Sequence, residues 1–392
     1  MATNSPSSSH PTLFSLFLHT SLLLLLTISS SCVTSRAQGG RGGGDDEGVA
    51  SSGARRRTGE LVPAMFVFGD SLIDNGNNND LPSFAKANYY PYGIDFSGGP
   101  TGRFSNGYTI VDEIGERRAH GAVRQYFVRF CLESHRDCIT YVGRIPFNQQ
   151  IRNFAASLAQ ISTRIGRAAT SESVRRSVLF VGFGSNDYLN NYLMPNYNTR
   201  LRYNKDQFSD LLIRQYRTQL ISLYNFGARK FMIANVGVLG CIPSVLAQNF
   251  LTHCSEEVDN LVLPFNNKVK LMVNNLNANL ANANFIYIDI YDMFADILNH
   301  PTAYGFSVID RGCCGIGRNS GQISCLPFQT PCDNREQYIF WDAFHPTSKV
   351  NIILARRAFN GSSNSVFPMN ILQLASYQPR IGLEKNLRTQ KS

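Results

Sequence analysis

Short apolar runs rich in β-branched and aromatic residues alternate along the chain with longer stretches of helical periodicity. The extended runs lie at 65–71, 177–188, 230–236 and 285–290, and the helical stretches lie at 206–225, 255–281 and 347–359. Strands that alternate with helices form a mainly parallel sheet with helices on its faces. A chain of 392 residues with 43% hydrophobic residues can bury one large core of this kind. The pattern therefore predicts an α/β fold.

Polar clusters stand where three extended runs end. They are Gly69-Asp70-Ser71, Gly184-Ser185-Asn186-Asp187 and, at the end of a last run at 338–347, Asp342-Ala343-Phe344-His345. Ligand sites in open α/β sheets lie at the carboxyl ends of the strands. We therefore expect the three clusters to meet at one edge of the sheet.

The side chains in these clusters suit nucleophilic catalysis. Cleavage of an ester by a serine needs a base, an acid that orients the base, and N–H donors for the oxyanion. Ser71 supplies a hydroxyl, His345 a base, and Asp342 lies three residues before that base. The backbone N–H of Ser71 and the side-chain amide of Asn186 are candidate oxyanion donors. Each piece alone fits a turn or a helix cap, but together they indicate a catalytic site.

Six motifs carry a resemblance to a known family: FVFGDSLIDNGNNN, GRFSNG, FVGFGSNDYLNNY, GARKFMIANVGVLGCIPS, GCCG and WDAFHPT. Together they resemble the plant GDSL-type esterase/lipase family, a branch of the SGNH hydrolases, over most of residues 61–380. The resemblance implies a flavodoxin-like three-layer α/β/α sandwich that hydrolyses carboxylic esters without a metal or other cofactor. It assigns Ser71 as nucleophile, His345 as base, Asp342 as its orienting partner and Asn186 as an oxyanion donor.

The resemblance is interrupted at residues 117–142. Between RFSNG and GSND the family carries a Gly-x-Asn block whose glycine N–H is a third oxyanion donor, and this chain has no such block. One interpretation is an altered reading frame or splice in the encoding message; the other is a true variant that lacks the glycine. The run QYFVRFCL at 125–132 is a candidate for a substitute strand.

The N-terminal region predicts export from the cell. An apolar run at 13–29 followed by small residues is typical of a secretory signal peptide, which we assign to 1–37, with a retained anchor as the alternative. Residues 38–60 form a Gly-rich charged leader, and 381–392 form a C-terminal tail. Asn360 begins an N-glycosylation sequon. We therefore expect a secreted, extracellular protein without stable membrane insertion.

The cysteines of the C-terminal half predict disulfides, because disulfides are usual in secreted chains. The candidates are Cys241, Cys254, Cys313, Cys314, Cys325 and Cys332. The first two are a plausible local pair, and the other four can staple the loop 312–332 in a connectivity that the sequence leaves open. A zinc site is the alternative, but no CxxC pair or nearby histidine cluster accompanies them.

Charge and pattern narrow the function further. The net charge of +9 is diffuse, without a basic stripe interleaved with aromatic residues, which argues against nucleic-acid binding. We expect a monomeric serine ester hydrolase acting on a lipid, an acylated cell-wall component or another small-molecule ester. The alternatives are a non-catalytic or impaired GDSL-like protein that binds a lipid or cell-wall ligand, and an acyltransferase that uses the same three residues.

Overall fold

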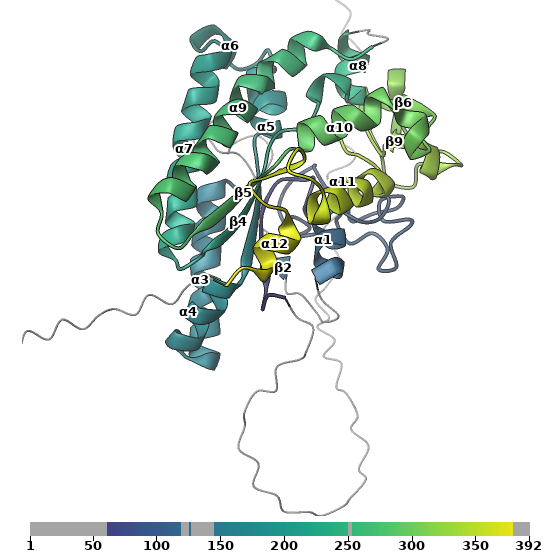
Figure 1. Ribbon diagram of the computed structural model, residues 1–392. Helices are drawn as coiled ribbons and strands as arrows, with labels where there is room; N and C mark the ends of the chain where they lie inside the picture. Colours follow the sequence, from purple (N-terminus) through teal and green to yellow (C-terminus); the bar gives the residue numbers. More distant parts are fainter. Residues whose placement is uncertain (1–60, 119–124, 127–144, 250–252, 379–392) are drawn as a thin grey trace, which may run out of the picture. The chain divides into compact units, whose positions relative to one another are not determined.

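Six strands form the central sheet of the computed structural model, which describes residues 61–118, 125–126, 145–249 and 253–378. These strands are β1 (Met65–Gly69), β2 (Gln125–Tyr126), β3 (Val178–Gly182), β4 (Lys230–Ala234), β5 (Asn284–Ile288) and β10 (Val366–Phe367). They lie in the order β10-β5-β4-β3-β1-β2 (Figure 1), and β10 is the only one of them that runs antiparallel to its neighbour. The predicted mainly parallel sheet is confirmed.

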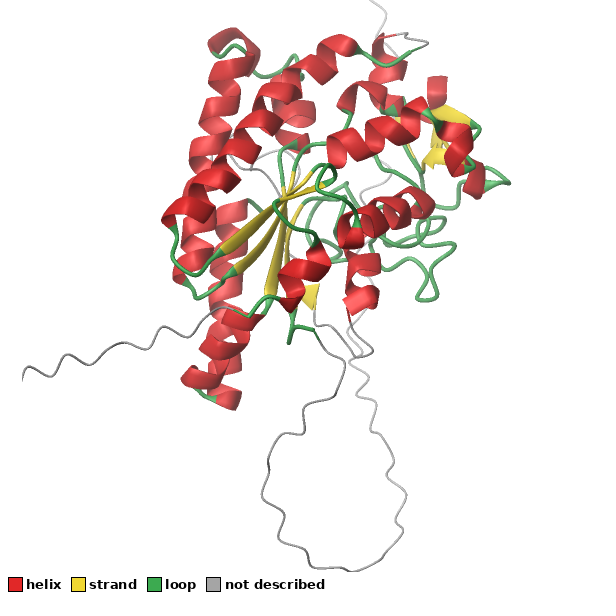
Figure 2. Ribbon diagram, viewed as in Figure 1, coloured by secondary structure: helices red, strands yellow, loops and turns green. Residues whose placement is uncertain are grey.

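Helices cover both faces of this sheet. They are α1 (Ile110–Arg118), α3 (Phe147–Ile165), α4 (Arg167–Arg176), α5 (Ser185–Asp187), α6 (Thr199–Arg202), α7 (Lys205–Asn225), α8 (Pro243–Asn249), α9 (Glu256–Asn279), α10 (Ile290–Asn299), α11 (Ser348–Asn360) and α12 (Ile371–Ser376). Figure 2 shows α3, α7 and α9 on one side of the sheet and α1, α11 and α12 on the other. The described residues thus form a three-layer α/β/α sandwich, as expected.

Short single turns complete the helical structure. They are η1 (Tyr188–Tyr192), η2 (Leu239–Cys241), η3 (Pro301–Tyr304), η4 (Arg318–Ser320) and η5 (Arg335–Gln337). Of these, η1 is a π-helical turn and the others are 3₁₀ turns. Because η1 continues directly from α5, it shapes the segment that follows β3 at the carboxyl edge of the sheet.

The core lies between the sheet and its helices. Side chains of β1, β3, β4 and β5 are almost all buried, as expected for strands covered on both faces. The rings of Phe231 and Phe285 stack across β4 and β5 with centroids 4.1 Å apart. Helix α9 buries Val262, Phe265 and Val269, whose spacing of three and four residues places them on one helical face.

One expectation about the sheet is wrong. The run at 338–347 does not end a strand of the central sheet: β9 (Tyr338–Phe340) pairs in parallel with β6 (Val308–Gly312) in a separate two-stranded sheet. A further pair, β7 (Gly315–Ile316) and β8 (Ile323–Ser324), lies in the loop that follows β6. The strand stops before Asp342 because that side chain accepts the backbone N–H groups of Phe344 and His345, which turns the chain.

Part of the interrupted segment lies beside β1. Gln125 and Tyr126 form β2 and pair in parallel with Met65 and Phe66. The rest of the candidate strand at 125–132, and most of 117–142, lie outside the described residues. The same holds for the predicted signal peptide, leader and C-terminal tail.

Three disulfides are present in the C-terminal half. Cys241 is joined to Cys254, Cys313 to Cys332, and Cys314 to Cys325. The zinc alternative is therefore wrong for these six cysteines. The last two bonds close the segment that carries β7 and β8 into cross-linked loops, and the N–H groups of Cys313 and Cys314 donate to the carbonyls of Phe340 and Trp341.

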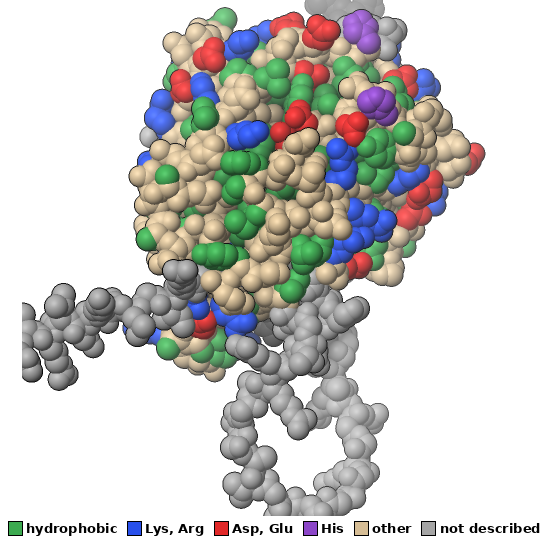
Figure 3. Space-filling model, viewed as in Figure 1, with side chains coloured by type: hydrophobic (Ala, Val, Ile, Leu, Met, Phe, Trp, Pro, Cys, Tyr) green, Lys and Arg blue, Asp and Glu red, His purple; other side chains and the backbone are tan. Residues whose placement is uncertain are grey.

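Two further features of the described residues concern surface charge and helix hydrophobicity. Figure 3 shows Lys and Arg side chains mixed with Asp and Glu over the visible face, so the positive charge is dispersed there. Within the described residues, no helix combines the length and apolar character needed to cross a membrane.

Asn266 provides a test of how the carboxyl edge of the sheet is held. From α9 its amide accepts the N–H of Val236 at 3.0 Å and donates to the carbonyl of Val236 at 2.8 Å, just beyond β4. Asn266→Ala leaves both buried backbone groups without a partner, so we expect it to lower the free energy of unfolding by about 2–4 kcal/mol. Urea unfolding followed by circular dichroism measures this.

The matched control is Asn274→Ala, an exposed asparagine on the same helix. Its effect should stay within about 0.5 kcal/mol. Equal losses in the two variants would contradict the role assigned to Asn266.

Candidate active site

Ser71 lies in a tight turn directly after β1. The carboxylate of Asp70 accepts the N–H of Leu72 at 3.1 Å, and the backbone carbonyl of Asp70 accepts the N–H of Ile73 at 3.1 Å. A Cβ on Gly69 would lie 2.2 Å from the Ile73 side chain, so this close turn requires glycine there. Ser71 is partly exposed at the carboxyl edge of the sheet.

The imidazole of His345 connects Ser71 to Asp342. Its Nε2 lies 2.7 Å from the Ser71 Oγ, and its Nδ1 lies 2.9 Å from each carboxylate oxygen of Asp342. Because an ionised carboxylate only accepts hydrogen bonds, the proton belongs on Nδ1, and Nε2 is left to accept the serine hydroxyl. In this tautomer the arrangement can take a proton from Ser71 when its oxygen attacks an electrophile.

The carboxylate of Asp342 is completely buried and satisfied by four donors. Its Oδ1 accepts the N–H groups of Phe344 and His345 at 2.8 Å each, and its Oδ2 accepts the hydroxyl of Tyr92 at 2.6 Å. Burial alone would raise the pKa of Asp342, but the charge and hydrogen bond of His345, helped by Tyr92 and Phe344, hold that pKa below its ordinary value.

The lowered pKa has a consequence for stability. The ionised form of Asp342 is favoured in the fold, so it stabilises the protein above the pKa of an unfolded aspartate. That contribution is lost as the pH falls through the lower, folded-state pKa.

Asn186 lies at the start of α5, and two neighbours fix its amide. Its Nδ2 donates to Asp70 at 3.1 Å, and its Oδ1 accepts from the Nδ2 of Asn190 at 2.6 Å. The chain reaches this position through Gly184 at φ +125°, where a Cβ would lie 2.7 Å from the side chain of Val236. The oxygen of Asn186 is thereby occupied by Asn190, and its Nδ2 group has a second N–H besides the one that donates to Asp70.

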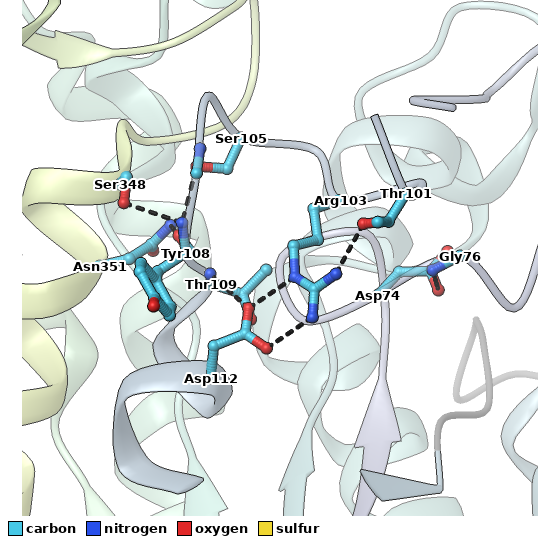
Figure 4. Close-up of polar contacts among 11 residues, drawn as sticks. Asp74, Gly76, Thr101, Arg103, Ser105, Tyr108, Thr109, Asp112, Ser348 and Asn351 are labelled. Atoms are coloured by element: carbon cyan, nitrogen blue, oxygen red, sulfur yellow. Dashed lines mark hydrogen bonds and ion pairs between the residues drawn. The ribbon is translucent and has the colours of Figure 1, made fainter. Parts of the chain in front are cut away.

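A buried ion pair holds the loop of the GRFSNG motif to α1. The guanidinium of Arg103 donates to both oxygens of Asp112 at 2.8 Å each, and to the hydroxyl of Thr101 at 2.6 Å (Figure 4). Asp112 also accepts the N–H and hydroxyl of Thr109 at 2.8 and 2.7 Å, which caps the first turn of α1. A buried, bidentate ion pair of this kind fixes the loop in one geometry.

The same loop is attached to α11, the helix that follows His345. The N–H of Tyr108 donates to the hydroxyl of Ser348 at 2.8 Å, and Asn351 donates to the carbonyl of Tyr108 at 2.9 Å (Figure 4). The N–H of Ser348 in turn donates to Asn106 at 2.8 Å. These bonds fix the start of α11 and so the residues that immediately precede it.

A cavity of about 470 Å³ opens at Ser71, His345 and Asn186. Its wall is largely apolar and includes Phe104, Phe183, Leu189, Leu239, Ile242, Phe294 and Leu354. Phe104 also packs against His345, with ring centroids 4.9 Å apart. A largely apolar wall with some polar groups is typical of a site for a small molecule with an apolar part.

The sequence-predicted residues Ser71, Asn186, Asp342 and His345 therefore all lie at one site. The third oxyanion donor was not found in the sequence, and the segment expected to supply it lies largely outside the described residues. Asn360, at the exposed end of α11, carries the sequon. The described residues contain no group of three His, Cys, Asp or Glu side chains suited to a metal ion.

Sequence reasoning did not identify several side chains that hold this site. Tyr92 was not singled out, and Asn190 and Phe104 were known only as parts of FVGFGSNDYLNNY and GRFSNG. The only signal for each of these two was its motif. Nothing in the local pattern around Tyr92 indicated a contact with Asp342, which is 250 residues away.

Known proteins resemble this chain over most of its length. The sequence profile of the family described as GDSL-like Lipase/Acylhydrolase matches residues 65–358. GDSL esterase/lipase At1g71691 of Arabidopsis thaliana is 56% identical over 336 residues, which cover 81% of this chain and 86% of the relative. GDSL esterase/lipase At1g29670 of the same plant is 45% identical over 336 residues, which cover 80% of this chain and 92% of the relative. The chain belongs to the GDSL lipase/acylhydrolase family, and with it to the carboxylic ester hydrolases.

Proposed function

We propose that this protein is a secreted serine ester hydrolase in which Ser71 is the nucleophile, His345 the general base and Asp342 its orienting partner. The observation that carries the proposal is the continuous hydrogen-bonded row from the Ser71 Oγ through both nitrogens of His345 to Asp342. A buried carboxylate that accepts the Nδ1 proton stabilises the imidazolium formed when Nε2 takes the serine proton.

The reaction proceeds through a covalent acyl-enzyme. The Ser71 Oγ attacks the ester carbonyl while its proton moves to His345 Nε2, and the carbonyl oxygen becomes an oxyanion. The intermediate collapses as the imidazolium gives that proton to the leaving alcohol. Water then attacks the acyl-serine with His345 again as base, which releases the carboxylic acid and restores Ser71.

The backbone N–H of Ser71 and the Nδ2 of Asn186 donate to the oxyanion. The bonds from Asn186 to Asp70 and Asn190 support this role, because they orient the amide before the substrate arrives. Loss of a third donor lowers kcat by about 10²–10³-fold, so a variant without the family's glycine is slow and not inactive.

The substrate is an ester with an apolar portion, from a lipid or another small molecule. The largely apolar wall of the cavity beside Ser71 supports this, because it can bury an acyl chain. An alcohol that takes the place of water would turn the same chemistry into acyl transfer. Analysis of the products with and without an alcohol acceptor separates the two outcomes.

The protein acts outside the cell as a monomer after removal of residues 1–37. The apolar run at 13–29 and the three disulfides support secretion, since disulfides persist in oxidising compartments. The exposed position of Asn360 is compatible with a glycan there.

Ser71→Ala tests the nucleophile. The purified variant should lose essentially all hydrolysis of a short p-nitrophenyl ester, because the substitution removes the Oγ that is bonded to His345. Release of p-nitrophenol is followed by absorbance, and the fold by circular dichroism.

The matched control is Ser157→Ala on the exposed side of α3, where the hydroxyl bonds only its own helix. It should keep the activity of the unmodified protein. Full activity in Ser71→Ala would refute the assignment. If the unmodified protein and Ser157→Ala are both folded but inactive, that result would favour the non-catalytic alternative.

Asn186→Ala tests the oxyanion donor. We expect kcat to fall about 10²–10³-fold with little change in KM, because the lost hydrogen bond forms mainly in the transition state. Steady-state kinetics on the same ester measure both constants. A rise in KM at unchanged kcat would show instead that Asn186 binds the ground state.

A further inference from the structure

We propose that Tyr92 is a positioning residue for this reaction: its hydroxyl holds Oδ2 of Asp342 and so sets how strongly that carboxylate binds the proton on His345. The inference rests on the proposed function of Ser71, His345 and Asp342. It adds to that function a residue from a loop remote in sequence, whose hydroxyl contacts the carboxylate of Asp342.

The contact is short and buried. The Oη of Tyr92 lies 2.6 Å from Oδ2 of Asp342, and only 2% of the Tyr92 surface is exposed. Its ring packs edge-on against Tyr89, Phe104 and Trp341, with centroids 5.3, 5.9 and 6.2 Å away. These contacts surround the ring, so the hydroxyl has little freedom to point elsewhere.

The two oxygens of Asp342 are held by different parts of the chain. Oδ1 accepts the backbone N–H groups of Phe344 and His345, which are local to the turn. Besides the imidazole, the donor to Oδ2 is Tyr92. Because Nδ1 of His345 lies 2.9 Å from both oxygens, the hydroxyl of Tyr92 competes with the imidazole for the charge on Oδ2.

Tyr92 remains a donor throughout the working pH range. Burial, and then the negative charge of Asp342, raise the pKa of the Tyr92 hydroxyl well above its ordinary value. Among the described residues, His345 is the other titratable group that acts on Asp342, and the charge of Asp342 in turn acts on Tyr89. The pKa of Tyr89 is raised to about 12, so it too is neutral near pH 7.

The loop closed by the Cys314–Cys325 disulfide also contacts Tyr92 and its neighbour Tyr89. The hydroxyl of Tyr92 lies 3.4 Å from the Ser324 Oγ, and Tyr89 donates to the carbonyl of Cys325 at 2.8 Å. Cys325 is bonded to Cys314, whose N–H donates to the carbonyl of Trp341 at 2.8 Å. Tyr92 and the residue before Asp342 therefore share one cross-linked support.

Tyr92→Phe tests the inference through the pH profile of kcat/KM. Without the hydroxyl, the charge on Oδ2 is less dispersed, so Asp342 binds the proton of the imidazolium more tightly. We expect the acid limb to move to higher pH by about half a unit, which lowers kcat/KM along that limb by up to about 3-fold. An unmoved acid limb, or one moved to lower pH, overturns the proposal.

A second substitution keeps the ring and the hydroxyl. Replacement of Tyr92 by 3-fluorotyrosine strengthens the donor with almost no change of shape, so the acid limb should move in the opposite direction, to lower pH. This variant tests the proposal even if Tyr92→Phe does not fold. A shift to higher pH, or none, counts against it.

Tyr89→Phe is the matched control, because it removes a hydroxyl bond to the same disulfide loop without touching Asp342. It should lower thermal stability and leave the acid limb where it is in the unmodified protein. A limb that moves as far in Tyr89→Phe as in Tyr92→Phe would show that general loosening of the loop is responsible, and would overturn the role of Tyr92.

A readout without turnover separates this inference from the proposed function. In the Ser71→Ala background, the His345 imidazole is followed by NMR through an acid titration, its signal assigned by comparison with His345→Asn. Adding Tyr92→Phe should move the midpoint to higher pH. A midpoint that stays in place refutes the inference alone, whereas full activity of Ser71→Ala refutes the proposed function.

Discussion

The buried carboxylate of Asp342 is the constraint on which the rest of the site depends. A charge with no exposed surface is tolerated in a fold only when donors surround it. Here the donors come from its own turn, from the imidazole of His345 and from Tyr92 in a distant loop. Each donor has to be in place for the charge to be stable. The carboxylate therefore connects the turn after β9 to the loop that carries Tyr92, two segments that share no strand or helix.

Hydrogen bonds, an ion pair and a disulfide in the surrounding loops hold those donors in position. The Arg103–Asp112 pair fixes the GRFSNG loop, which is bonded to the first turn of α11. The Cys314–Cys325 disulfide closes a second loop, in which the N–H of Cys314 donates to the carbonyl of Trp341. Preorganised donors and acceptors do not need to rearrange when charge develops, and this is the main physical advantage of such a rigid setting.

The sequence predicted the chemical groups better than it predicted their supports. Ser71 and Asn186 follow strands of a parallel sheet, whose carboxyl ends share one edge, and so their proximity could be inferred. Asp342 and His345 lie three residues apart, so a local turn was enough to bring them together. These conclusions rest on periodicity and short-range geometry, which one sequence records.

Other features depend on contacts that no local pattern records. The run before Asp342 looked like another strand of the main sheet, yet β9 pairs with β6, because pairing partners are chosen by tertiary packing. The pairing within Cys313, Cys314, Cys325 and Cys332 was left open for the same reason. Tyr92 lies in an irregular loop without helical or strand periodicity, so its contact with Asp342 could be found only in three dimensions.

The most direct test of the central claim is covalent labelling with a small fluorophosphonate, followed by peptide mapping. A serine becomes reactive toward this reagent only when a neighbouring base removes its proton. The account predicts one adduct, on the Oγ of Ser71, and its loss in a folded His345→Ala variant. An adduct on another residue, or labelling of Ser71 that does not depend on His345, would contradict the account.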